Sequence, residues 1–147
     1  MKKIISVIVA LLSSLCFLPL SAQTVYRQLK IRDKVFTVEI SDTLAKRSLG
    51  LGKRQNLPED HGMFFIFERK GIYPFWMKDM KFPIDIVWIN NDRVIGVTER
   101  IPQPKGKFPL AYYAPPSLID RVLELNSGTA KIIGIKEGDT VTIFGEQ

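Results

Sequence analysis

One acidic residue stands inside an apolar segment of the chain. Asp85 interrupts the run 84–89, and strand alternation places it on the same face as Val87. An isolated buried charge is very costly, so Asp85 needs a partner such as Lys78, Arg47 or backbone N–H groups. The alternative is a general acid with a raised pKa at a pocket wall. Asp85 is therefore the candidate catalytic residue, and both interpretations stay open.

A second group of residues suits binding rather than catalysis. On a strand, Trp76 and Lys78 share one face, which sets an aromatic surface beside a cation. This combination suits a carboxylated sugar or another anionic ligand. The structural alternative is that Trp76 packs while Lys78 extends past it into water. Tyr112 and Tyr113, in a proline-rich segment, are the aromatic residues expected to extend this surface.

Other chemistries have little support in the sequence. The single Cys and single His exclude a disulfide framework, a Cys/His zinc cluster and a Cys–His nucleophile pair. His61 is either a solvated turn residue or a general base. Glycine-rich phosphate loops, serine-nucleophile elbows and calcium-loop spacings are not found, so we expect no metal and no cofactor. A two-carboxylate glycosidase pairing Asp85 with Asp79 or Glu124 stays formally open, although Glu124 is better explained as a helix cap or ion-pair residue.

The first 22 residues have the pattern of a secretory signal. Lys2 and Lys3 precede an apolar stretch from Ile4 to Leu18, and small residues end at Ala22. We expect cleavage after Ala22, which leaves a mature domain of residues 23–147 that is exported to the periplasm. The apolar stretch is shorter than the roughly 20 residues that span a bilayer, so no stable membrane span is expected after cleavage. The alternative is a protein anchored in the membrane by an uncleaved N-terminal segment.

The net charge of the chain limits the kinds of partner that we expect. Loss of Lys2 and Lys3 lowers the formal net charge from +6 to +4, and Cys16 is lost with them. A mild positive charge favours acidic envelope polymers. The export signal and the lack of a concentrated basic stripe argue against nucleic acid. We therefore expect an envelope ligand or protein as the partner, and a monomeric chain.

The elements that must position these residues are predicted to be strands. The chain of 147 residues suits one domain. Alternating or continuous apolar segments between turn signals predict strands at 25–31, 35–40, 63–67, 75–80, 84–89, 94–98, 130–135 and 140–144. Short helices are predicted near 42–50, capped by Ser41 or Asp42, and near 117–126. The fold class is therefore mainly β, a compact single-domain β-sandwich or barrel-like fold with two short helices.

A set of short motifs is spread from about residue 28 to residue 144. In chain order they are Gly50-Leu51 with Arg54, Leu57-Pro58-Glu59-Asp60, Gly62-Met63-Phe64-Phe65, Phe75-Trp76-Met77-Lys78, Pro83-Ile84-Asp85, Pro102, Tyr112, Val122-Leu123-Glu124-Leu125 with Gly128, and Gly138-Asp139. Together they resemble the domain of unknown function 192 family. Gly52 and Asp79-Met80 depart from the family's usual Met and Asn-Thr. The resemblance implies a compact, often exported β-sandwich-like domain, and it implies no reaction.

Two functions therefore remain open. The first is a non-catalytic binding module for an anionic glycan or peptide of the envelope, which uses the five candidate residues Arg54, Trp76, Lys78, Tyr112 and Tyr113. The second is a carboxylate-based hydrolase centred on Asp85, so whether the protein is an enzyme stays undecided. A solvent-reached cleft around Asp85 with a second carboxylate favours the enzyme.

Overall fold

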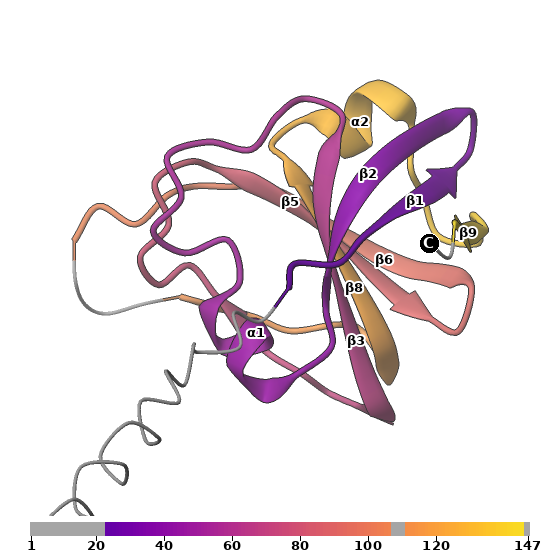
Figure 1. Ribbon diagram of the computed structural model, residues 1–147, viewed down its shortest axis with the longest axis horizontal. Coiled ribbons are helices and arrows are strands. Elements are labelled where there is room, and N and C mark those ends of the chain that lie inside the picture. The colour runs from indigo at the N-terminus through magenta and orange to yellow at the C-terminus, as the bar shows by residue number, and fades with distance from the viewer. Residues whose placement is uncertain (1–22, 107–110, 146–147) are drawn as a thin grey trace, which may run out of the picture.

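A seven-stranded sheet that curls on itself organises the domain (Figure 1). The computed structural model describes residues 23–106 and 111–145. The strands follow the spatial order β6-β5-β8-β3-β2-β1-β9, and β4 pairs with β7 in a separate two-stranded sheet. Their bounds are β1 Tyr26–Ile31, β2 Lys34–Ser41, β3 His61–Gly71, β4 Phe75–Trp76, β5 Ile84–Asn90, β6 Arg93–Ile101, β7 Tyr112–Tyr113, β8 Ile119–Asn126 and β9 Val141–Phe144.

The curl brings the two ends of the sheet together. Arg93 at the start of β6 forms an isolated antiparallel bridge with Thr140, next to β9. Backbone hydrogen bonds from Val94 to Asp139 and from Val141 to Asp92, 2.9 and 2.8 Å long, continue this seam. The prediction of a mainly β, compact single-domain fold, a β-sandwich or barrel-like fold with two short helices, is therefore confirmed, and the sheet is a curled one.

The sheet is antiparallel except where β2 runs parallel to β3. A parallel pair requires a long crossover, which here contains the helix α1, Leu44–Leu49. The Thr43 hydroxyl caps α1 by accepting the Lys46 N–H at 3.2 Å, so the cap is Thr43 rather than Ser41 or Asp42. The helix ends at Gly50, whose φ of 52° is easily reached only by glycine.

Two clusters of buried side chains cover the two faces of the sheet. The first cluster takes residues from all seven strands, from Leu29 on β1 to Val141 on β9, and therefore fills the inside of the curl. The second takes strand residues only from β3, β5, β6 and β8. Loop residues such as Leu51 and Met77 cover it from outside. The central strands are thus buried on both faces, which explains the continuous apolar runs of β3 and β5.

Three predicted elements are wrong. Residues 117–126 form no helix, because 119–126 are the strand β8, which lies between β3 and β5. The strand predicted at 130–135 is replaced by the helix α2, Thr129–Ile133, which starts and ends at glycines with positive φ. The strand predicted at 75–80 is limited to β4, because the chain turns at Asp79, whose φ is 59°.

The secretory signal predicted at 1–22 lies outside the described residues. Within residues 23–106 and 111–145, no helix is both long and apolar enough to cross a membrane.

Candidate ligand-binding cleft

A two-lobed cleft lies on the outer side of the sheet. It is bounded by α1 and the loop after it, by β3, and by the segment that carries β4. The first lobe has a volume of about 490 Å³ and the second about 220 Å³. Five residues line both lobes, so the lobes lie side by side: Arg47, Ser48, Phe65, Phe75 and Trp76.

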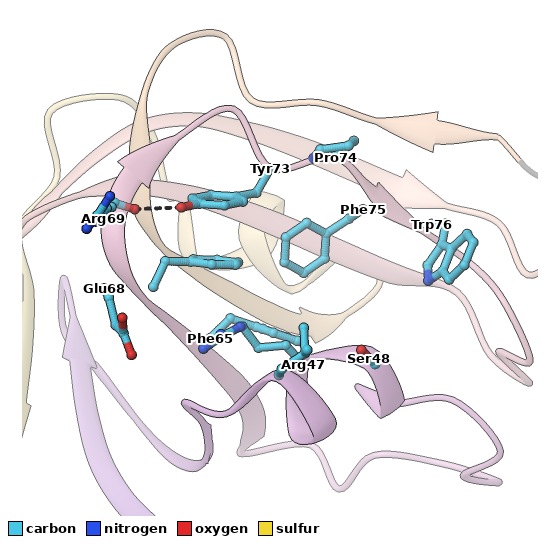
Figure 2. A pocket seen from close by; sticks show the side chains of 11 residues that line it. Arg47, Ser48, Phe65, Glu68, Arg69, Tyr73, Pro74, Phe75 and Trp76 are labelled. Atoms are coloured by element: carbon cyan, nitrogen blue, oxygen red, sulfur yellow. Dashed lines mark hydrogen bonds between the residues drawn. The ribbon is translucent and has the colours of Figure 1, made fainter.

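Aromatic rings line the first lobe (Figure 2). Phe67 and Tyr73 stack with 3.9 Å between ring centroids, and Phe65 meets Phe75 edge-to-face at 4.9 Å. The Tyr73 hydroxyl donates to the Arg69 carbonyl at 2.8 Å, which fixes the outer ring. These contacts give the lobe a preformed apolar wall, as ligand pockets commonly have.

Arg47 supplies a fixed positive charge between the lobes. Its Nη1 atom donates to the carbonyls of Asp42 at 2.6 Å and Ile66 at 2.8 Å. The guanidinium carbon lies 5.1 Å from the centroid of the Phe67 ring. Arg47 is therefore held by two backbone carbonyls and an aromatic face, and these contacts do not neutralise its charge.

Trp76 stands at the mouth of the cleft, at the end away from Glu68 and Arg69 (Figure 2). Its side chain is 44% exposed, the Lys78 Nζ lies 5.3 Å from its ring, and Tyr112 lies 5.9 Å from it between centroids. The pairing of β4 with β7 sets Trp76 opposite Tyr112. The mouth thus combines two exposed aromatic rings with a cation.

Glu124 is a buried acid in the wall of the second lobe. It is 5% exposed, and the strand register places it between Met63 and Ile86, which offer it no polar group. Its Oε2 atom is buried without a hydrogen-bond partner. Burial raises the pKa of Glu124 to about 8, and the positive charge of Arg54 opposes this only in part. At neutral pH Glu124 is therefore mainly a neutral carboxylic acid.

Arg54 does not neutralise Glu124 because it is already paired. It meets Glu39 through two contacts, 2.9 Å from Nη2 to Oε1 and 2.8 Å from Nη1 to Oε2. The hydrogen bond to Glu39 is the main cause that raises the pKa of Arg54. This fork-to-fork pair holds Arg54 away from the lobe, whose lining does not include it.

Two loops are in contact with each other at the rim of the second lobe. The Lys53 N–H donates to the Asp79 carbonyl at 2.8 Å, and Gly52 lies against the Lys78 carbonyl. A Cβ atom at Gly52 would stand 3.0 Å from the Leu49 carbonyl oxygen and 3.2 Å from that of Lys78. This close approach brings the side chains of Lys53 and Lys78 to the same rim.

Asp85 lies apart from the cleft. It is fully buried, and backbone N–H groups of Arg100, Gly128 and Ala130 donate to its carboxylate at 2.7, 3.0 and 2.9 Å. Gly128 is the N-cap of α2 and has no side chain to cap the helix, so Asp85 supplies the acceptor from β5. Its partners are backbone donors rather than Lys78 or Arg47.

The structure brings together only some of the candidate residues. Trp76 and Lys78 line the cleft and Tyr112 flanks it. Tyr113 packs against the outer core cluster, and Arg54 is bound to Glu39. His61 begins β3 with its Nδ1 atom buried and without a hydrogen-bond partner, rather than standing in a solvated turn.

Two cleft residues escaped the sequence interpretation. Arg47 was weighed only as a partner for Asp85. Glu124 was weighed as a helix cap or ion-pair residue and as a possible second carboxylate beside Asp85, but not as a binding residue. The signal for Glu124 was present, because it interrupts the apolar run 122–125 in the way that Asp85 interrupts its own. Because residues 117–126 were interpreted as a helix, this signal was not recognised. Among the residues described, no group of three or more His, Cys, Asp or Glu side chains could hold a metal ion.

Comparisons with known proteins agree on the fold. The family model of the domain of unknown function 192, described as uncharacterized ACR, matches residues 27–143. A crystal structure from Sinorhizobium meliloti 1021, described provisionally as a transcription regulator, superimposes with a TM-score of 0.74 at 27% identity, over 82% of this chain and 95% of that one. A protein of unknown function from Novosphingobium aromaticivorans DSM 12444 gives a TM-score of 0.72 at 29% identity, over 84% and 89%. No curated protein matches the sequence.

Proposed function

The chain belongs to the domain of unknown function 192 family, and on that premise we propose that it is a non-catalytic binding module for an anionic glycan of the cell envelope. The observation that carries this proposal is the mouth of the cleft, where Trp76 stands beside Lys78 and Tyr112. Exposed aromatic rings bind the apolar faces of sugars, and a neighbouring cation selects acidic ones.

The charges around the cleft support an anionic ligand. Among the side chains that line the two lobes, Arg47, Lys53, Arg69 and Lys78 are cations. Glu68, Asp79 and Glu124 are the acids of the lining, and Glu124 is mainly neutral. The lining therefore carries a net positive charge at neutral pH, which attracts acidic ligands.

Isothermal titration with matched oligosaccharides tests the proposal. We expect a tetrasaccharide of alternating glucuronate and N-acetylglucosamine to bind, and a neutral N-acetylglucosamine tetrasaccharide to bind at least tenfold more weakly. Trp76→Ala should weaken binding by about tenfold, or about 1.4 kcal/mol. Phe144→Ala is the matched control, because Phe144 is equally exposed, at 43%, but lies on β9.

Two further ligand classes serve as competing outcomes. A short peptide with a free C-terminal carboxylate represents an envelope peptide, and duplex DNA represents the role described for the Sinorhizobium protein. Tighter binding of either one, or equal binding of the acidic and neutral tetrasaccharides, would overturn the proposal.

The hydrolase centred on Asp85 is the alternative activity. Asp85 is fully buried and accepts three backbone hydrogen bonds, so its role is structural. It does not line the cleft. These observations favour binding over catalysis. Release of product from the acidic tetrasaccharide that is abolished by Asp85→Asn would reverse this preference.

Export to the periplasm is part of the proposal. It is supported by the charged, apolar and small-residue regions of the first 22 residues. The intact mass of the protein from an envelope fraction should correspond to a chain that begins at Gln23. A mass that retains residues 1–22 in the membrane fraction would support the anchored alternative instead.

A further inference from the structure

We infer that Glu124 seats the anionic group of the ligand: its neutral carboxyl donates an O–H hydrogen bond, inside the second lobe, to the carboxylate of an acidic sugar. This inference rests on the proposed function and adds the residue and the chemistry that recognise the charge. The sugar ring then lies toward Trp76, which lines both lobes.

The unpartnered oxygen of Glu124 is the first support. A buried polar atom without a hydrogen bond costs free energy, and most buried polar atoms in proteins have a hydrogen-bond partner. The Oε2 atom of Glu124 is buried without a partner in a side chain that lines a cleft. A ligand carboxylate held against this wall of the lobe would give the Glu124 carboxyl group a hydrogen-bond partner.

The positions of the neighbouring charges are the second support. Lys53 and Lys78 stand on the two loops that close the rim, and Arg47 lies where the lobes meet. On the other sides, Met63 of β3 and Ile86 of β5 are apolar. Asp79 is the acid at the rim, and Arg54 beyond the wall is bound to Glu39. An anion that enters the lobe therefore meets cations at the rim and then a hydrogen-bond donor, the Glu124 carboxyl group, in the wall.

A neutral acid is well suited to this task. An O–H donor that meets a carboxylate makes a short, charge-assisted hydrogen bond, about twice as strong as one between neutral groups. An ionised Glu124 would instead repel the ligand. Because burial holds the pKa of Glu124 at about 8, the donor form is present at neutral pH and is lost as the pH rises above 8.

The pH dependence of binding tests the inference. The apparent Kd equals the intrinsic Kd divided by the fraction of protein that is protonated at Glu124. For wild type we expect binding of the glucuronate tetrasaccharide to weaken by about tenfold between pH 6.5 and pH 9, since the pKa is about 8. Glu124→Gln keeps an uncharged donor at every pH, so its Kd should stay level across this range.

Two further variants complete the design. Glu124→Leu removes the donor and should bind weakly at every pH, while its circular dichroism spectrum checks that it folds. Glu137→Gln is the matched control, because Glu137 is exposed on the turn before β9, and it should keep the wild-type pH profile.

The outcomes separate this inference from the proposed function. If the tetrasaccharide binds wild type with the same Kd at pH 6.5 and pH 9, or if Glu124→Gln follows the wild-type slope, Glu124 is not the donor and the binding module stands. If the tetrasaccharide does not bind at any pH, the proposed function itself fails.

Discussion

At the scale of single residues, the two buried acids differ in what satisfies them. Asp85 receives three backbone N–H groups, so its burial is compensated. Glu124 lies among apolar neighbours with one oxygen unpartnered, so its burial is compensated only by protonation or by a ligand. Similar local sequence, an acid within an apolar run, thus gives a structural residue in one strand and a candidate binding residue in another.

Asp85→Ala should destabilise the domain strongly. It leaves three backbone N–H groups without this acceptor, one of them in a buried and two in part-buried hydrogen bonds, and we expect a loss of roughly 3–5 kcal/mol in the free energy of unfolding. Asp85→Asn keeps one acceptor oxygen and should lose less, about 2 kcal/mol. Urea unfolding midpoints measure both, with Asp33→Ala in the exposed β1–β2 turn as the control. An unchanged midpoint for Asp85→Ala would show that the three hydrogen bonds contribute nothing to stability.

Glu124 should make the free energy of unfolding fall as the pH rises. An ion-paired acid has the opposite effect. Its pKa is about 8 in the folded chain and near the ordinary value of 4.5 in the unfolded chain. The folded state therefore holds a proton that the unfolded state releases between these values, and stability falls as the pH rises from about 5 to 8. Unfolding midpoints without ligand should show this fall in wild type, and Glu124→Gln should abolish it. A wild-type midpoint that falls no more over this interval than the midpoint of Glu124→Gln would contradict the raised pKa of Glu124.

At the scale of elements, the sequence predicted strands well where the apolar pattern was local. The β1–β2 hairpin, β3, β5 and β6 lie where alternation and turn residues placed them. The β8 segment was wrong because Ser117 and Asp120 resemble a helix cap, and Leu118, Val122 and Leu123 are spaced as on a helix face. Its strand conformation follows from its position between β3 and β5, and a single sequence does not contain that position.

The candidate site was only half predictable for the same reason. The association of Trp76 with Lys78 was predicted from strand alternation. The two side chains do meet, but Lys78 lies on the turn after β4 rather than on the strand. Arg47 and Glu124 reach the cleft from α1 and β8, and only the sheet order and the crossover bring these elements together. Distant pairings of this kind are set by the tertiary fold rather than by local pattern.

The contact between the two rim loops should be sensitive to a single methyl group. In Gly52→Ala the added Cβ would stand 3.0 and 3.2 Å from two backbone oxygens, which have little freedom to move. We expect a loss of about 1–3 kcal/mol of stability, together with weaker binding of the acidic tetrasaccharide, because the rim that carries Lys53 and Lys78 opens. Gly106→Ala, where nothing lies within 4 Å of the new atom, is the control. Wild-type stability in Gly52→Ala would show that the two loops separate freely.

At the scale of the whole molecule, the two faces of the sheet have different tasks. The inner face is filled by the first cluster and closed by the Arg93–Thr140 bridge, so it holds the strands together. The outer face is covered by loops, and the cleft lies where this cover meets the sheet. Changes in the loops can therefore alter the ligand while the curled sheet stays the same, which suits a binding module.

The three hydrogen bonds to Asp85 also bear on how long the folded domain lasts. Their donors belong to β6 and to the start of α2, so they form together only when β5, β6 and the segment after β8 have assembled. We expect hydrogen bonds that join three separate segments to be absent from the folding transition state, and their loss then speeds unfolding rather than slowing folding. In stopped-flow measurements Asp85→Ala should raise the unfolding rate by roughly two to four orders of magnitude, as the loss of about 3–5 kcal/mol requires, and leave the folding rate nearly unchanged. Asp85 would then set the lifetime of the native state.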